Sequence, residues 1–121
     1  MRLQATMLLC CALALGGCAA APARPSSKAA GAADAADEQA MRQAVHELRE
    51  RKAATVVPRA HNDCQEVCKL ADLICEASDR ICDIASRHAS EESYAKQCRG
   101  AEKDCKGAQG DCDRCTGDPY S

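Results

Sequence analysis

Residues 64–115 of this 121-residue chain read CQEVCKLADLICEASDRICDIASRHASEESYAKQCRGAEKDCKGAQGDCDRC, a stretch that contains eight cysteines. Counted from the middle outward, the residue numbers of the cysteines match in pairs: three pairs add up to 180, and the outermost adds up to 179. A constant sum is expected of residues that face each other across an antiparallel hairpin. The facing pairs are Cys82 with Cys98, Cys75 with Cys105, Cys68 with Cys112, and Cys64 with Cys115.

The spacing of the cysteines along each arm indicates helices. Three cysteines on each arm are seven residues apart, which is about two helical turns, whereas the same spacing on a strand would alternate between its two faces. Helix axes that pack about 8–10 Å apart bring facing Cα atoms to within about 3.5–5.5 Å, close enough at the wide end of that range for disulfides. We therefore predict an all-α fold: a disulfide-laddered antiparallel helical hairpin over residues 62–118.

The start of the chain has the features of an export signal. Residues 1–17 combine a basic residue, Arg2, with a short apolar core over residues 7–15. The sequence Leu15-Gly16-Gly17-Cys18 resembles the lipobox of bacterial lipoproteins. This resemblance implies cleavage before Cys18 and acylation of Cys18, so that lipid chains hold the protein on a membrane. The alternative is an ordinary signal peptide with a chance cysteine.

The resemblance to lipoproteins also implies a location. Ala19 stands next to the lipidated position, where Asp is the usual signal for retention in the inner membrane. We therefore expect a lipid-anchored protein of the cell envelope, on the outer membrane rather than the inner one. Cys10 and Cys11 would leave with the signal peptide, so the eleven cysteines become one lipidated residue and an even set of eight. An even set in a small exported domain is typical of a disulfide framework.

The arrangement of the cysteines carries a second resemblance. Cys68-Lys69-Leu70-Ala71-Asp72, followed by Ile74-Cys75 and Ile81-Cys82-Asp83-Ile84-Ala85 and then by three spaced cysteines and a C-x-x-C, is similar to small Cys-rich lipoproteins of myxobacteria-like Gram-negative bacteria. That resemblance implies no particular activity.

Two further segments lie between the signal and the hairpin. Residues 18–35 are rich in Ala, Pro, Gly and Ser, and we interpret them as a lipidated flexible tether. Residues 36–57 are predicted to form an amphipathic helix, because Met41, Val45 and Leu48 recur at helical spacing. Pro58 is expected to end this helix.

A second apolar stripe runs along the first hairpin helix, next to the cysteine seam. We call it the isoleucine stripe; its large residues are Val67, Leu70, Ile74, Ile81 and Ile84. Cross-linking the hairpin along its cysteines would leave this stripe exposed. Either the upstream helix covers it in a three-helix bundle, which is our preferred interpretation, or it is a docking stripe for a homodimer or another partner.

Three kinds of chemistry are alternatives to a structural role for these residues. Cys112 and Cys115 have the C-x-x-C spacing of thiol–disulfide oxidoreductases, but each already has a facing cysteine. The thiols resemble those of helical copper storage proteins, and Cys64, Cys68, Cys112 and Cys115 together offer a tetrahedral set for Zn(II). The histidines, His46, His61 and His88, are scattered and are expected to be exposed. We identify no catalytic residues and expect no cofactor.

The charge distribution argues against a nucleic-acid partner. Residues 63–121 hold 8 basic and 13 acidic side chains, and residues 1–62 hold 8 basic and 5 acidic ones. An acidic domain is repelled by phosphates, and only Tyr94 and Tyr120 are aromatic. The sequence thus predicts a non-enzymatic outer-membrane lipoprotein, a disulfide-stabilised spacer or docking module. The alternative is a thiolate binder of Cu(I) or Zn(II).

Overall fold

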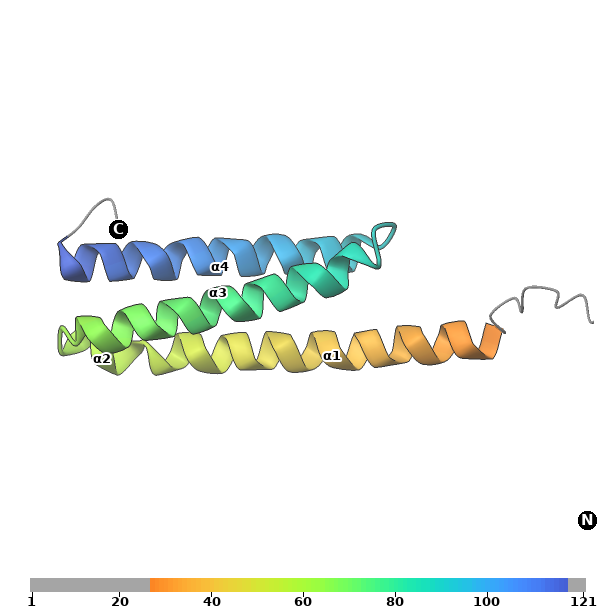
Figure 1. The fold of residues 1–121 in the computed structure, drawn as a ribbon, viewed down its shortest axis with the longest axis horizontal. Coiled ribbons are helices and arrows are strands. Elements are labelled where there is room, and N and C mark those ends of the chain that lie inside the picture. Colours follow the sequence, from red (N-terminus) through yellow and green to blue (C-terminus); the bar gives the residue numbers. More distant parts are fainter. Residues whose placement is uncertain (1–26, 118–121) are drawn as a thin grey trace, which may run out of the picture.

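The computed structural model describes residues 27–117. In this part of the chain α1 spans Ser27–Ala54, α2 spans Val56–Ala60, α3 spans Cys64–Ser86 and α4 spans Glu92–Thr116. Figure 1 shows an elongated arrangement in which α3 lies between α1 and α4 and packs against both. The all-α class, the antiparallel hairpin and the upstream helix are all as the sequence predicts. The predicted signal peptide, residues 1–17, lies outside the described residues, as does the first part of the tether.

Helix α1 begins earlier than predicted. The sequence assigned residues 18–35 to a flexible tether, but the helix already starts at Ser27. The physical reason is composition: residues 29–36 are mostly alanine, the best helix former, and the last proline before them is Pro25. The other end is close to the prediction. Pro58 has no N–H to donate to the carbonyl of Ala54, where α1 stops before the short helix α2.

Two turns connect the helices into an antiparallel hairpin that folds back on α1. Between α2 and α3, Asn62 adopts a left-handed conformation with φ 53°, which asparagine tolerates well. Asp63 then caps α3 by accepting a hydrogen bond from the backbone N–H of Glu66. At the second turn, α4 follows Glu91, whose side chain makes no capping hydrogen bond.

The core decides between the two interpretations of the isoleucine stripe and rules out the alternative of an exposed docking stripe. All five large residues of the isoleucine stripe are buried, with Val67, Ile74 and Ile81 at most 2 % exposed. The central part of the stripe packs in one cluster with Met41 and Leu48 of α1. The upstream helix therefore covers the stripe, as in our preferred interpretation. In this fold the stripe is core and is not a surface for a second subunit.

Polar contacts also join α1 to the hairpin. Arg51 donates a hydrogen bond to the backbone carbonyl of Leu73 on α3 at 2.7 Å. Lys52 forms an ion pair with Asp104 of α4 at 2.6 Å. Because Arg51 contacts α3 and Lys52 contacts α4, these two contacts fix the position of α1 along the hairpin. Among the described residues, none of the helices combines the length and apolar character that crossing a membrane requires.

Candidate functional site

The disulfide ladder joins α3 to α4 at four points, from Cys82–Cys98 to Cys64–Cys115 at the open end of the hairpin. Its four disulfides are those that the sequence symmetry predicts: Cys64–Cys115, Cys68–Cys112, Cys75–Cys105 and Cys82–Cys98. The paired Cα atoms are 5.4 Å apart at the outermost bridge and 4.6 Å apart at the innermost. All eight cysteines are half-buried, so the ladder lies along the rim of the helix–helix contact.

Small residues bring the two helices close enough for these bonds. The buried seam between the cysteines contains Ala71, Ser78 and Ala85 on α3, and Ala101 and Ala108 on α4. Larger side chains at these positions would hold the helix axes farther apart than a disulfide can span. Small residues also bury little apolar area in the seam, so the disulfides supply stability that packing does not.

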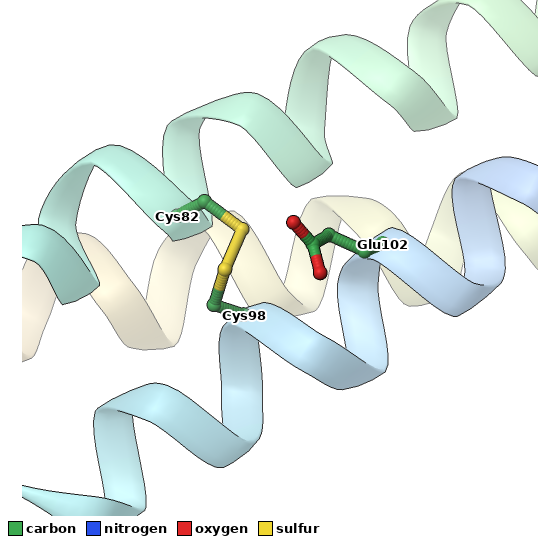
Figure 2. A group of neighbouring side chains, drawn as sticks. All are labelled: Cys82, Cys98 and Glu102. Atoms are coloured by element: carbon green, nitrogen blue, oxygen red, sulfur yellow. A yellow bond between two sulfur atoms is a disulfide. The ribbon is translucent and has the colours of Figure 1, made fainter.

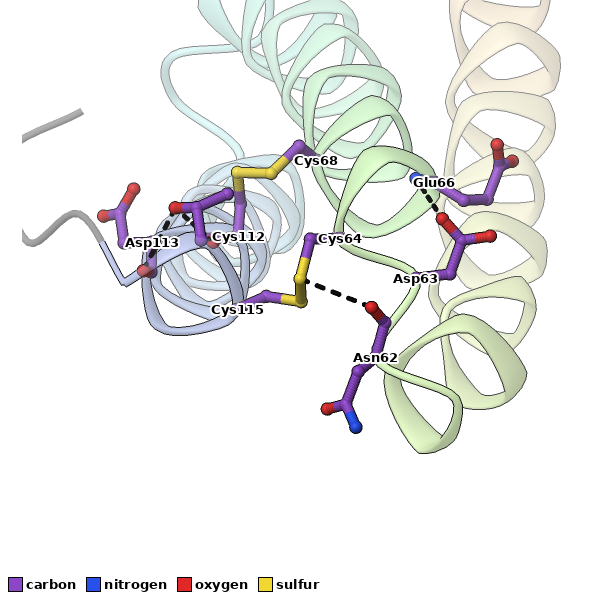
Figure 3. The surroundings of a disulfide bond; sticks show 9 residues. Asn62, Asp63, Cys64, Glu66, Cys68, Cys112, Asp113 and Cys115 are labelled. Carbon is purple, nitrogen blue, oxygen red and sulfur yellow. Dashed lines mark hydrogen bonds between the residues drawn. A yellow bond between two sulfur atoms is a disulfide. The ribbon is translucent and has the colours of Figure 1, made fainter.

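The open end of the hairpin contains the cysteines that we considered as zinc ligands. Figure 3 shows Cys64 bonded to Cys115 and Cys68 bonded to Cys112. A sulfur in a disulfide is not a thiolate, and the thiolate is the form that binds zinc. The C-x-x-C pair is likewise divided between two bridges. In this fold, two disulfides close the open end of the hairpin.

One further group has the composition of a metal site. The sulfurs of Cys82 and Cys98 and a carboxylate oxygen of Glu102 lie within 4.8 Å of one another (Figure 2). Both sulfurs belong to the innermost disulfide, and Glu102 is exposed on the next turn of α4. The group therefore offers one carboxylate and no thiolate while the bridge is intact.

A polar cluster at the hairpin turn is the feature that sequence reasoning missed. His88 was expected to be exposed, but it is buried between α1 and the start of α4. Its ring stacks on Tyr94, with centroids 4.1 Å apart and planes inclined by 10°. Its Nδ1 lies 3.0 Å from Oε1 of Glu91, and its Nε2 lies 3.0 Å from Oδ2 of Asp37 on α1. We call this group, together with Arg87, the histidine clasp.

The clasp requires a charged imidazole. Carboxylates only accept hydrogen bonds, so both ring nitrogens must carry a proton for both contacts to be made. The hydrogen bonds to Glu91 and Asp37 accordingly raise the pKa of His88 above its ordinary value. Arg87 donates from Nε and from its terminal nitrogen to the two oxygens of Asp37, at 3.0 and 2.9 Å. The hydrogen bonds from Arg87 and then His88 lower the pKa of Asp37 to about 2.

Comparison with protein-family models, with curated proteins and with solved structures finds no match for this chain.

The candidate sites are therefore assigned from the residues of this chain alone. The eight disulfide cysteines stand where the sequence places them, and the isoleucine stripe is core. The predicted lipidation residue, Cys18, lies outside the described residues. The histidine clasp had one signal in the sequence, the short turn that contains Arg87 and His88. Nothing in the spacing of Asp37 pointed to a partner some fifty residues away.

Proposed function

We propose that this protein is a non-enzymatic lipoprotein of the bacterial outer membrane that acts as a rigid, disulfide-stabilised spacer or docking module. The observation that carries the proposal is the coupling of a lipobox-like Leu15-Gly16-Gly17-Cys18 to a covalently cross-linked helical rod. A lipidated Cys18 would anchor the chain durably, because several acyl chains hold far more strongly than one.

The geometry of the rod supports a spacing role. Helix α1 has 28 residues, which corresponds to a length of about 42 Å. Its N-terminal end lies on the side of the lipidation site in the sequence, and it packs on a hairpin whose helices are joined at four points. Such a rod transmits position without bending easily. It would hold its α2 end away from the membrane surface.

The competing proposal, a thiolate binder of Cu(I) or Zn(II), has weaker support. It requires the reduction of at least two of the four disulfides before four thiolates become available. An exported protein encounters an oxidising compartment, in which disulfides persist. We therefore place the structural role first.

The anchoring step is tested by labelling cells with an alkyne analogue of palmitate and isolating the full chain. We expect label on the wild-type protein, loss of the label in Cys18→Ala, and retention of the wild-type protein in the outer-membrane fraction of a density gradient. Wild-type protein without label, or label that survives in Cys18→Ala, would contradict the anchoring proposal.

A further inference from the structure

Three hollows follow one another between α1 and α4. Their volumes are ≈ 300, ≈ 160 and ≈ 330 Å³ from the hairpin turn toward α2. Neighbouring hollows share lining residues: Gln97 belongs to the first two, and Lys52 and Asp104 belong to the last two. The middle and last hollows end on Ile81 and Ile74 of α3, which are 0 % and 2 % exposed, so the accessible surface of these hollows belongs to α1, α2 and α4. Together the hollows form one long depression, which we call the α1–α4 groove.

The α4 side of this groove contains two glycines that the chain's own packing does not require. Gly100 lines the middle hollow and Gly107 the last one. A Cβ atom at either position would meet nothing within 4 Å. Each glycine inside a helix costs about 0.8–1 kcal/mol relative to alanine. No internal contact requires a glycine at either position, and both glycines leave room for another backbone to approach α4 closely.

Two of the three hollows have a charge opposite to that of the hairpin, whereas the first hollow is lined by Glu38, Glu91 and Arg42. The middle and last hollows are lined by five basic and two acidic side chains, although residues 63–121 as a whole carry a net charge of about −5. Asp104 and Asp111 are each engaged, Asp104 by Lys52 and Asp111 by Arg59 at 3.0 Å.

Two exposed cations line the groove without an ion-pair partner among the described residues. Arg49 and Lys103 make no ion pair with any residue that the structure describes. An occupant with carboxylates along its flanks would neutralise both of them.

We propose that the α1–α4 groove binds an acidic amphipathic helix of a partner protein. Such a helix would lay small apolar residues in the depression between α1 and α4, approach α4 at Gly100 and Gly107, and place carboxylates beside Arg49 and Lys103. Seated above α3, it would complete a four-helix arrangement. A second copy of the chain is a poorer occupant, because a two-fold axis brings the same concave surface against itself.

This inference deepens the docking role proposed above and rests on it. The test uses the full chain extracted from membranes in a nonionic detergent, with micelles alone as the blank. The probe is a fluorescein-labelled synthetic helix with alanine on one face and glutamate along both flanks. Two further probes carry glutamine or lysine in place of the glutamates. Binding is measured by fluorescence anisotropy.

The variants test the shape of the groove separately from its charge. Gly107→Leu fills the last hollow and raises helix propensity, and its matched control is Gly31→Leu, which also meets nothing within 4 Å but lines none of the hollows. We expect Gly107→Leu to weaken binding of the glutamate probe by about tenfold or more and Gly31→Leu to leave it unchanged. If Gly107→Leu fails to fold, as judged by far-UV circular dichroism, Gly100→Leu replaces it.

Charge is tested by reversing one cation at a time. Lys103→Glu should weaken binding of the glutamate probe, and Lys106→Glu, which lies outside the groove on the same helix, should not. The lysine probe should bind at least about tenfold more weakly than the glutamate probe.

Several outcomes would overturn the inference. These are no binding of the glutamate probe, equal binding of the glutamate and lysine probes, and equal effects of Gly107→Leu and Gly31→Leu. Concentration-dependent dimerisation that Gly107→Leu abolishes would assign the groove to a second copy instead. The palmitate labelling at Cys18 is read independently: loss of anchoring with intact probe binding refutes the anchoring proposal alone, and anchoring without probe binding refutes the groove.

Discussion

Removing the second disulfide from the hairpin turn measures how much of the stability is covalent. In the double variant Cys75→Ala, Cys105→Ala, the bridges Cys68–Cys112 and Cys82–Cys98 remain, so the variant merges two small rings into one. Each of these rings contains about 14 residues, seven on each helix. The entropy of closing such a ring corresponds to about 3 kcal/mol at 25 °C. The same calculation gives about 2 kcal/mol for the outermost bridge, whose ring spans about 7 residues.

The assay is guanidinium unfolding followed by far-UV circular dichroism, without reductant. We expect the double variant to unfold about 3 kcal/mol more easily than the wild type, equivalent to a Tm lower by about 12–24 °C. Reduction of all four bridges should remove on the order of 10 kcal/mol, as much as the whole stability of a typical domain, and α3 and α4 should lose their helical signal.

The matched control is the double variant Cys64→Ala, Cys115→Ala, which should cost less than the Cys75–Cys105 variant. A fully reduced protein that keeps its native helical signal would refute the reasoning. So would a Cys75–Cys105 variant that is as stable as the wild type.

Three further predictions concern the core and the histidine clasp. Ile81→Ala, at a side chain with 0 % exposure, should cost about 2–5 kcal/mol in the same unfolding assay, whereas Val57→Ala at an exposed position should change stability by less than about 0.5 kcal/mol; equal effects would contradict the packing described here. Because the pKa of His88 is raised in the folded protein, the contribution of His88 to the free energy of unfolding is fully present below about pH 6.5 and is lost as the pH rises through the raised value. The slope of stability against pH in this range should disappear in His88→Gln. An unchanged slope would exclude the clasp as its cause. The pKa of Asp37 is lowered to about 2, so the contribution of Asp37 to the free energy of unfolding is present above its ordinary pKa of 3.8 and is lost as the pH falls toward 2. Asp37→Asn should remove this loss of stability in acid and speed hydrogen exchange of α1 near Asp37 while α3 stays protected. Protection throughout α1 would contradict the role of Asp37.

The hairpin could be predicted from sequence because its constraints are arithmetic. Cysteine positions with a constant sum and seven-residue spacing allow one ladder of facing pairs on two antiparallel helices. The apolar positions Met41 and Leu48 also favoured the upstream helix as the cover of the isoleucine stripe, although the sequence alone left a second subunit as the alternative.

The remaining features depend on three-dimensional proximity that no spacing encodes. The clasp joins Asp37 to Arg87 and His88, and its geometry depends on where α1 comes to lie along the hairpin. The groove depends on how far α1 stands from α4, which is set by the large side chains of α3 between them. The helical start at Ser27 was missed because an alanine-rich segment is compatible with both a tether and a helix.

The central claim is that the mature protein combines a lipid anchor with a fully oxidised ladder. It is tested most directly by the intact mass of the full chain, purified from the envelope without reductant. We expect a chain that begins at Cys18, carries the added mass of its acyl groups, and weighs eight hydrogens less than its reduced form, two for each of the four disulfides. A mass without acyl groups, or one that shows free thiols with a stoichiometric metal ion, would contradict it.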